Sequence, residues 1–293
     1  MPSDWDPEGP DLVFEGDNLP LLQSLPGESF RLIYADPPFN TGRTQQRQSI
    51  TTARSASGGR IGFQGQPYAT VKGQLTAYND TFTDYWAFLE PRLEEIWRIL
   101  TSDGTLYLHL DYREVHYAKV LLDALFGPES FLNEIIWAYD YGARTKSRWP
   151  AKHDNLLVYV KDPENYVFNA EEVDREPYMA PGLVTPDKVA RGKLPTDVWW
   201  HTIVSPTGKE KTGYPTQKPQ GVLRRIVQAS SNSGDWVADF FAGSGTTGAV
   251  ARQMGRRFLL ADSNPDAIDV IRRRLAGDHP AGSGTRYLRS DPV

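Results

Sequence analysis

The chain has no cysteine among its 293 residues. Disulfide bonds, thiolate metal sites and a cysteine nucleophile are therefore excluded as sources of its stability or chemistry. Its five histidines are scattered, and no two stand at the close spacing that zinc ligands usually show. We therefore expect no metal site, and any chemistry has to come from other polar side chains.

Long apolar runs are also missing. No stretch approaches the length of a membrane span, and the first residues lack the basic and then apolar pattern of an export signal. With 39% hydrophobic and 24% charged residues, the composition is that of an ordinary soluble protein, long enough for one large α/β domain with an insertion or for two small domains. We expect a cytoplasmic protein without a membrane partner.

Acidic residues are absent from one long segment. The net charge of −5 counts against a nucleic-acid partner, whose phosphates attract cations. Residues 43–79, however, contain five basic residues and no acidic one, and residues 140–225 contain 14 basic residues against 11 acidic ones. Positive charge confined to two segments of an acidic chain is compatible with DNA binding. Residues 43–78 also lack hydrophobic periodicity, which predicts a flexible basic loop, either a flap over DNA or a surface insertion without a role.

A strand that runs into two prolines organises the chain. Residues 30–35 predict a buried strand, and Pro37 and Pro38 cannot continue a sheet ladder because neither has an N–H group to donate. The strand therefore ends at Asp36, whose carboxylate lies at the edge of the sheet where α/β proteins bind ligands. The Asp36 carboxylate, the free Pro37 carbonyl and the Phe39 ring suit a flat group with an exocyclic amine. The alternative is an ordinary strand-ending turn.

A strand, turn and helix pattern covers residues 234–254. Its glycine-rich turn contains Gly243 and Gly245, which allow a ligand to approach the backbone closely. The next strand ends at Asp262, 17 residues after Gly245, near the expected place of an acidic residue that binds ribose hydroxyls. This pattern predicts a nucleotide-like cofactor. With Gly248 as the third glycine, the spacing alone also permits a nicotinamide-dependent oxidoreductase.

Two shorter motifs stand beside predicted helices. Residues 16–18, Gly-Asp-Asn, end one predicted strand and suit the N-cap of the helix that follows. Residues 214–219, Tyr-Pro-Thr-Gln-Lys-Pro, open another predicted helix. Thr216 and Lys218 bring a hydroxyl group and a cation to this helix start, which is a suitable place for a carboxylate.

Together these elements resemble the β class of DNA amino-methyltransferases, which methylate the exocyclic nitrogen of adenine or cytosine. Asp36–Phe39 is similar to the family's D/N/S-P-P-Y/F motif, and residues 214–219 are similar to its H-P-T-Q-K-P signature with tyrosine in place of histidine. Residues 239–247 add Phe-Ala-Gly-Ser-Gly, so that the target turn comes first and the cofactor loop last. The missing cysteine argues against the ring-carbon class of cytosine methyltransferases, which attack through one.

The resemblance covers nearly the whole chain outside residues 43–78 and 163–212. It implies an α/β fold with a doubly wound, mostly parallel, seven-stranded Rossmann-like sheet in circularly permuted order, one antiparallel strand pair and an inserted target-recognition region. Within one catalytic domain, residues 11–162 would form the half with the target-base turn. Residues 163–213 would form the recognition insertion, and residues 214–280 the cofactor half, followed by a loose tail.

The same resemblance implies S-adenosyl-L-methionine as the cofactor and assigns the site residues. The catalytic residues are those of the turn: Asp36, Pro37, Pro38 and Phe39. The cofactor-binding residues come from strand ends and from the helix start: Asp17, Asn18, Asp36, Thr216, Lys218, Asp239, Phe241, Ala242, Gly243, Ser244, Gly245, Thr246, Asp262 and Ser263. The DNA-binding residues follow the turn or lie in a later loop rich in basic and aromatic residues: Asn40, Arg43, Arg144, Lys146, Arg148 and Lys152.

Aspartate at the first position of the turn motif favours adenine N6 as the target, with direct transfer to a base flipped out of duplex DNA. Cytosine N4 is the alternative, and Phe39 in place of tyrosine weakens the choice. By analogy, we expect a homodimer, a cognate restriction endonuclease and an association with the bacterial nucleoid. His109 and Asp111 end another predicted strand, where we expect a structural role, with a catalytic one as the alternative.

Overall fold

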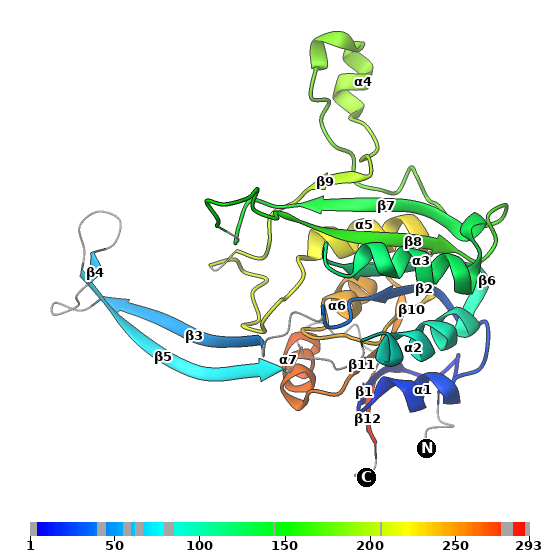
Figure 1. Cartoon of the computed structure of the whole chain (residues 1–293), viewed down its shortest axis with the longest axis horizontal. Helices are drawn as coiled ribbons and strands as arrows, with labels where there is room; N and C mark the ends of the chain where they lie inside the picture. The colour runs from blue at the N-terminus through cyan, green and yellow to red at the C-terminus, as the bar shows by residue number, and fades with distance from the viewer. Residues whose placement is uncertain are drawn as a thin grey trace.

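The computed structural model describes residues 5–39, 45–54, 60–61, 67–78, 85–142, 144–205, 207–276 and 284–290. A nine-stranded sheet runs through the described part of the molecule (Figure 1). Its strands, in spatial order, are β12 (Thr285–Arg289), β1 (Asp11–Glu15), β11 (Arg257–Asp262), β10 (Trp236–Asp239), β2 (Phe30–Ala35), β6 (Leu100–Leu110), β8 (His153–Val160), β7 (Phe131–Ala138) and β9 (Val198–Trp200).

Neighbouring strands of this sheet are parallel except at β8, which runs against both β6 and β7. The seven expected strands extend from β1 to β7, and the expected mostly parallel α/β fold is confirmed. One further strand lies at each edge. Of these, β12 falls in the tail that was expected to be loose, and that expectation is wrong. The strand is recognisable only with its partner, since β1 supplies the hydrogen bonds of one edge and Glu15 pairs with Arg289 at 3.1 Å.

The register of the central strands brings their carboxyl ends together. Glu15 of β1 is paired with Asp262 of β11, and Asp239 of β10 is paired with Tyr34 of β2. Strand β2 lies beside β10 although the two are far apart in the chain, as the permuted order requires. The residues that directly follow β1, β2, β10 and β11 therefore meet at one edge of the sheet.

Helices cover both faces of the sheet (Figure 1). One face carries α1 (Asn18–Ser24), α2 (Tyr85–Ile99), α3 (Val115–Phe126) and the short 3₁₀ turn η2 (Pro128–Ser130), and the other carries α5 (Gln220–Ser230), α6 (Thr246–Gln253) and α7 (Pro265–Leu275). Side chains of β2 alternate between the two cores, as the pleat dictates. Ile33 belongs to the core under α1 and α2, whereas Leu32 and Tyr34 belong to the core under α5 and α6.

Residues 45–78 contain a ribbon where an irregular loop was expected. Strand β5 (Pro67–Tyr78) pairs in antiparallel fashion with β3 (Gln45–Arg54) and with the short β4 (Arg60–Ile61). Figure 1 shows this ribbon extending away from the main sheet. A ribbon satisfies its backbone groups by pairing, and Thr, Val, Gln and Tyr fit strands without a hydrophobic alternation, so a prediction based on periodicity misses it.

The insertion between β8 and α5 carries a small raised element (Figure 1). It consists of the 3₁₀ turn η3 (Pro181–Leu183) and the short helix α4 (Pro186–Arg191). A two-way backbone bridge between Glu176 and Lys193 closes its base, with both N–H···O distances at 2.8 Å. The raised element therefore stands on a defined stalk within the region expected to recognise the target.

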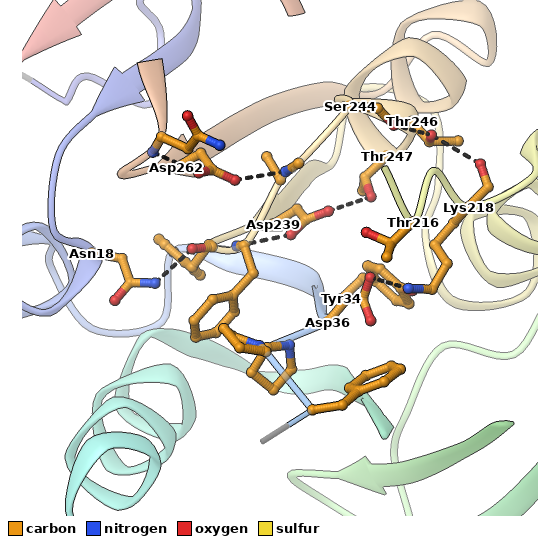
Figure 2. A pocket seen from close by; sticks show the side chains of 18 of the residues that line it. Asn18, Tyr34, Asp36, Thr216, Lys218, Asp239, Ser244, Thr246, Thr247 and Asp262 are labelled. Atoms are coloured by element: carbon orange, nitrogen blue, oxygen red, sulfur yellow. Dashed lines mark hydrogen bonds and ion pairs between the residues drawn. The ribbon is translucent and has the colours of Figure 1, made fainter. Parts of the chain in front are cut away.

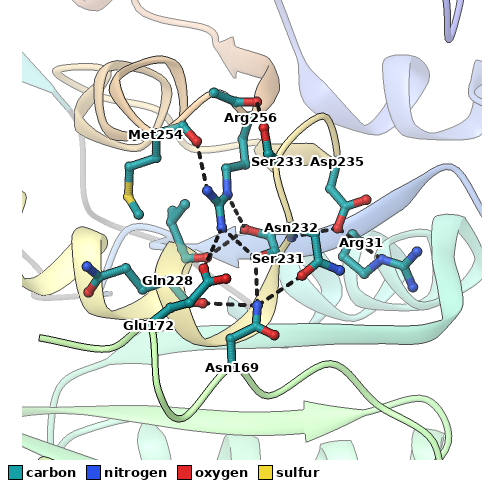
Figure 3. Close-up of polar contacts among 12 residues, drawn as sticks. Arg31, Asn169, Glu172, Gln228, Ser231, Asn232, Ser233, Asp235, Met254 and Arg256 are labelled. Carbon is teal, nitrogen blue, oxygen red and sulfur yellow. Dashed lines mark hydrogen bonds and ion pairs between the residues drawn. The ribbon is translucent and has the colours of Figure 1, made fainter.

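A polar cluster anchors the start of this insertion to the end of α5 (Figure 3). Asn169 Nδ2 donates to the Ser231 carbonyl oxygen at 3.0 Å and to that of Gln228 at 3.3 Å. The buried Arg256 donates to the Ser231 carbonyl oxygen at 2.7 Å and lies 3.6 Å from the Glu172 carboxylate. The insertion is thus fastened near the amino ends of β10 and β11, whereas the strand-end carboxylates meet at the carboxyl ends.

None of the helices in the described residues combines the length and the apolar character needed to cross a membrane.

Candidate active site

A cavity of about 790 Å³ opens at the edge where β1, β2, β10 and β11 end (Figure 2). Its volume is in the range of sites that bury a whole small molecule. All four residues predicted to be catalytic line it, and so do the residues predicted to bind the cofactor, with the exception of Gly245. Segments far apart in the sequence therefore supply one site, as the motifs had indicated.

The Asp36 carboxylate presents its two oxygens differently. Lys218 Nζ contacts Oδ2, whereas Oδ1 is buried and has no hydrogen-bond donor among the described residues. The Phe39 ring lies beside the pair, with Lys218 Nζ 5.1 Å from its centroid. Lys218 was expected to meet the carboxylate of a ligand, and in this structure it is paired with the protein's own Asp36. Asp36 and Phe39 both line the cavity, so a carboxylate and an aromatic ring are present there together.

The start of α5 is tied to the glycine-rich loop. Thr246 Oγ1 donates to the Lys218 carbonyl oxygen at 3.0 Å, and Arg274 donates to Thr246 Oγ1 at 2.9 Å. Thr216 lines the cavity with φ of +58°, a left-handed conformation that is unfavourable for a β-branched residue. Such strain is found mainly where a binding site requires it.

The glycine-rich loop is shaped by two carboxylates, the buried Asp239 and the half-buried Asp262. Asp239 accepts from the Phe241 N–H at 3.0 Å and from Thr247 Oγ1 at 2.6 Å. Burial raises the pKa of Asp239 to about 7, and the nearby carboxylates of Asp36 and Asp262 add to the rise. Asp262 Oδ2 accepts from the Gly243 N–H at 2.8 Å, and burial raises the pKa of Asp262 as well. Both carboxylates therefore hold the loop in place.

The glycines of this loop have separate tasks. Gly243, with φ of +50°, lines the cavity and brings backbone to its surface. Gly245, with φ of +70°, does not line the cavity, and a Cβ there would lie 2.7 Å from Ile271 of α7. A Cβ on Gly248 would lie 2.6 Å from Leu260 of β11. Assigning Gly245 to cofactor contact is therefore not supported, since Gly245 serves close packing of helices and strands.

The far end of the cavity is organised by an arginine that the motifs did not reveal. Arg92 of α2 donates to Asn18 Oδ1 at 2.6 Å and to Asp17 Oδ1 at 2.7 Å. Asn18 Nδ2 in turn donates to the Phe240 carbonyl oxygen at 2.6 Å. Asp17 also caps α1 by accepting from the Leu19 N–H at 3.0 Å, so it serves as helix cap and cavity wall. A basic residue on the apolar face of α2, between Leu89 and Ile96, was the signal available in the sequence.

The polar and aromatic groups that line the cavity suit a nucleoside-containing cofactor. Asp17 and Asp262 place carboxylates at the ends of adjacent strands, and Phe88 and Phe241 give the cavity an aromatic wall between them and Asp36. Carboxylates at strand ends suit ribose hydroxyls, and apolar walls suit a purine ring. The residues present therefore fit S-adenosylmethionine.

Two hydrogen-bonded pairs, one containing His109 and the other containing Asp154, underlie the turn. Tyr34 Oη lies 2.6 Å from His109 Nδ1, and His109 Nε2 lies 3.3 Å from Asp154 Oδ2. Tyr139 Oη donates to Asp154 Oδ1 at 3.1 Å. His109 is completely buried, whereas Tyr34, Tyr139 and Asp154 line the cavity. Asp111, which the sequence singled out with His109, is engaged by Arg113.

The predicted DNA-binding residues divide into two sets. Arg144, Lys146 and Arg148 are exposed in the loop between β7 and β8, and Lys152 is half-buried at its end. Residues 139 and 154, which flank this loop, both line the cavity. The two ends of the loop therefore border the cavity, although none of the four basic residues lines it. The other two, Asn40 and Arg43, lie outside the described residues.

Comparisons with known proteins agree with this geometry. A model of the DNA methylase family matches residues 30–273. DNA adenine methyltransferase YhdJ of Escherichia coli is 31% identical over 271 residues, which cover 90% of this chain and 82% of that protein. Type II methyltransferase M.HpaI of Haemophilus parainfluenzae is 30% identical over 254 residues, covering 87% of this chain and 70% of that protein.

Solved structures share the fold. The cytosine-N4-specific PvuII DNA methyltransferase superimposes with a TM-score of 0.60 at 15% identity, covering 96% of this chain and 95% of that one. A DNA modification methylase of Thermus thermophilus, complexed with S-adenosyl-L-methionine, gives a TM-score of 0.56 at 22% identity, covering 95% of this chain and 99% of that one. Since the family match spans most of the chain, the protein is a β-class member of the N6-adenine and N4-cytosine DNA methyltransferases and uses S-adenosylmethionine as methyl donor.

Proposed function

We propose that the protein methylates the exocyclic N6 amine of adenine in duplex DNA. The observation that carries this proposal is the Asp36 carboxylate, which lines the cavity together with the Phe39 ring and whose Oδ1 has no hydrogen-bond donor among the described residues. An acceptor and an aromatic face at one place match the two features of an aminated base. Adenine is favoured over cytosine because aspartate begins the motif and because the relative at 31% identity is a DNA adenine methyltransferase.

The role of Asp36 follows from the electronic structure of the amine. The lone pair of an aromatic amine is shared with the ring, which makes the nitrogen a poor nucleophile. Bound S-adenosylmethionine supplies a methyl group on a positively charged sulfur. Asp36 Oδ1 and the Pro37 carbonyl oxygen would accept the two amine hydrogens and favour the pyramidal form, whose lone pair points at the methyl group. After transfer, the extra proton would pass from the nitrogen to the Asp36 carboxylate and from there to water, and no covalent enzyme intermediate is needed.

The cofactor would extend from the glycine-rich loop to the start of α5. We assign its ribose hydroxyls to Asp262, its adenine end to the side of Asp17, and its carboxylate end to Thr216 and Lys218. Lys218 would then lie between the cofactor carboxylate and Asp36, and its charged hydrogen bond would keep the Asp36 side chain in one orientation while the base binds. Asp239 would contribute by holding the loop, because both of its oxygens are already engaged by the protein.

The target base has to leave the duplex to reach Asp36. Phe39 would stack on the flipped base, and the exposed Arg144, Lys146 and Arg148 of the β7–β8 loop would bind phosphates. The insertion of residues 163–213, which carries the raised element, is the proposed target-reading part. The basic segment of residues 43–78 is the proposed DNA-covering part. A homodimer, a cognate restriction endonuclease and a cytoplasmic location at the nucleoid complete the proposal by analogy with bacterial type II systems. A nicotinamide-dependent oxidoreductase is not supported, because the family model that matches residues 30–273 is that of DNA methylases.

Nucleoside mass spectrometry tests the proposal directly. The protein is incubated with S-adenosylmethionine and unmethylated genomic DNA, and the DNA is then digested to nucleosides. N6-methyladenine is the expected product. N4-methylcytosine would overturn the choice of base while keeping the family chemistry. The Asp36→Ala variant is the control, because any methylated nucleoside that it forms at the wild-type rate does not come from this site.

A further inference from the structure

The segment that opens α5 turns its side chains to two different regions of the molecule. Tyr214, Thr216 and Lys218 line the cavity. Gln217 stands between the last two in the chain, but it does not line the cavity and is only 9% exposed. The proposed methyl transfer gives Gln217 no role. Because a buried amide needs hydrogen-bond partners, its partners indicate what it does.

The Gln217 amide bonds to the last residues of the recognition insertion. Its Oε1 accepts from the Thr212 N–H and from the Thr212 hydroxyl, both at 2.8 Å, and its Nε2 donates to the Glu210 carbonyl oxygen at 2.7 Å. A backbone N–H can only donate, and a carbonyl oxygen can only accept. These partners therefore fix the orientation of the amide and the direction of its bonds to the backbone.

A further hydrogen bond joins the same two segments. The Gln220 N–H, in the first turn of α5, donates to the Glu210 carboxylate at 2.9 Å. An N–H group in the first turn has no partner within the helix, so this carboxylate stabilises the helix start. Glu210 thus holds the segment twice, through its carbonyl oxygen and through its side chain. We name Glu210, Thr212, Gln217 and Gln220 the latch.

The latch lies next to the residues assigned to the cofactor carboxylate. Thr216 has a left-handed φ of +58°, which its surroundings have to maintain. Lys218 contacts Asp36 through Nζ, and its carbonyl oxygen accepts from Thr246 Oγ1 at 3.0 Å (Figure 2). Gln217 connects these two residues, so bonds to its side chain restrain the backbone that carries both. A movement of residues 210–212 would therefore be passed to Thr216 and Lys218.

We propose that Gln217 is a positioning residue that couples the recognition insertion to the cofactor site. Its amide holds residues 210–212 against the segment of Thr216 and Lys218, so that S-adenosylmethionine bound there orders the end of the insertion. Coupling of this kind is reciprocal, and DNA that orders the same residues strengthens cofactor binding. The inference rests on the proposed function, which assigns the cofactor carboxylate to Thr216 and Lys218 and target reading to the insertion.

The variant Gln217→Met tests the latch, because methionine has a similar size and flexibility but cannot replace the hydrogen bonds. Gln228→Met is the matched control. The buried Gln228 also fastens the insertion to α5, since its amide accepts from the Asp174 N–H at 3.3 Å and donates to Asp174 Oδ1 at 3.1 Å. It lies in the last turn of α5 and does not line the cavity. Thermal unfolding measures the stability that each variant loses.

Amide hydrogen exchange gives a readout that does not depend on activity. It is measured with and without S-adenosylhomocysteine, which keeps the carboxylate of the cofactor and cannot transfer a methyl group. In wild type and in Gln228→Met, we expect this ligand to slow exchange in residues 208–212 by about tenfold, within the range of coupling between two sites. In Gln217→Met, exchange in residues 208–212 should be faster without ligand and should not respond to it.

Calorimetry gives the second readout, the Kd for S-adenosylhomocysteine. We expect Gln217→Met to raise this Kd by about tenfold. Gln228→Met should keep the wild-type value. Thr212→Val removes only the hydroxyl bond to Gln217, so it should change both readouts in the same direction but less, and it tests the latch even if Gln217→Met does not fold.

The inference is overturned if the ligand slows exchange in residues 208–212 equally in Gln217→Met and Gln228→Met, or if the two variants have the same Kd. The latch would then only hold the chain together. Failure of the proposed function would appear differently. Lys218→Met would bind S-adenosylhomocysteine as tightly as wild type, or the wild-type enzyme would form a methylated nucleoside other than N6-methyladenine.

Discussion

Asp36 directly follows β2, and Asp239 ends the adjacent strand β10. The hydrogen-bond partners of the two carboxylates differ, and so do their proposed roles. Both oxygens of Asp239 are engaged by the Phe241 N–H and the Thr247 hydroxyl, and the side chain is buried. Asp36 has one oxygen with Lys218 and one without a donor among the described residues. The sequence places both carboxylates at the same edge, but hydrogen-bond occupancy depends on three-dimensional neighbours such as Lys218, 182 positions away in the chain.

Substitution of Asp36 separates chemistry from cofactor binding. Asp36→Ala removes the acceptor for the amine, and we expect methyl transfer to fall at least about 100-fold, the scale of losing one electrostatic contact in a transition state. Asp36→Asn keeps one acceptor oxygen and should fall between alanine and wild type. Binding of S-adenosylmethionine, measured by calorimetry, should persist in both variants. Equal turnover in Asp36→Ala and wild type would contradict the role given to this carboxylate.

The raised pKa of Asp239 predicts a pH-dependent contribution to stability. Its pKa is about 7 in the folded protein against an ordinary value of 3.8, so the folded state binds a proton more tightly than the unfolded state. Between these values, stability falls as pH rises, because the unfolded chain ionises Asp239 freely while the folded protein keeps it protonated. Asp239→Asn stays neutral and should lose this dependence. The melting temperature of the variant minus that of wild type should therefore increase by several degrees from about pH 4 to about pH 7.

The prediction concerns only how the difference in melting temperature between variant and wild type changes with pH. The amide also alters the hydrogen bond with Thr247, but this effect is the same at every pH. A difference that stays flat over the range would show that Asp239 is ionised in the folded protein throughout.

At the scale of elements, prediction from the sequence succeeded where an apolar face is buried. The bounds expected for β2, residues 30–35, are those observed, because its apolar residues pack in the two cores. The β3–β5 ribbon, β12 and α4 were not predicted. None of the residues of α4 is buried, and β12 is a partly exposed edge strand, so the sequence of neither element shows hydrophobic periodicity.

The polar cluster around Asn169, which anchors the start of the insertion, predicts the local stability of that segment. Asn169 Nδ2 donates to the carbonyl oxygens of Gln228 and Ser231 and to Asn232 Oδ1. Asn169→Ala removes this donor while the Ser231 carbonyl oxygen keeps Arg256, so the expected cost is about 1 kcal/mol. We expect faster amide hydrogen exchange in residues 163–213 and unchanged exchange in the central strands. Asn165→Ala is the control, because Asn165 is exposed and lies four residues earlier.

If exchange in residues 163–213 were the same in both variants, the insertion would have to be held by other contacts, such as the ion pair between Arg225 and Glu176 at 2.5 Å.

The charge of the whole molecule poses the remaining question, because an acidic protein has to bind an acidic polymer. The net charge is −5, yet the loop between β7 and β8, whose ends border the cavity, exposes Arg144, Lys146 and Arg148. Neutralised phosphates release counterions, so each contact adds to the salt dependence of DNA affinity. The distribution of charge around the cavity, and not its sum, should therefore govern binding.

Replacing these three residues with glutamine should weaken DNA binding and reduce the salt dependence. The slope of log Kd against log salt concentration should fall by up to about 3, close to one unit for each phosphate contact removed. The matched control replaces Arg272, Arg273 and Arg286, which are exposed on α7 and β12 near the opposite edge of the sheet, so the net charge changes equally. A general electrostatic effect would lower both slopes alike, whereas a DNA path along the β7–β8 loop lowers only the first. Equal slopes in the two triple variants would therefore exclude this loop as the phosphate-binding surface, and the basic ribbon would be the next segment to test by the same substitution.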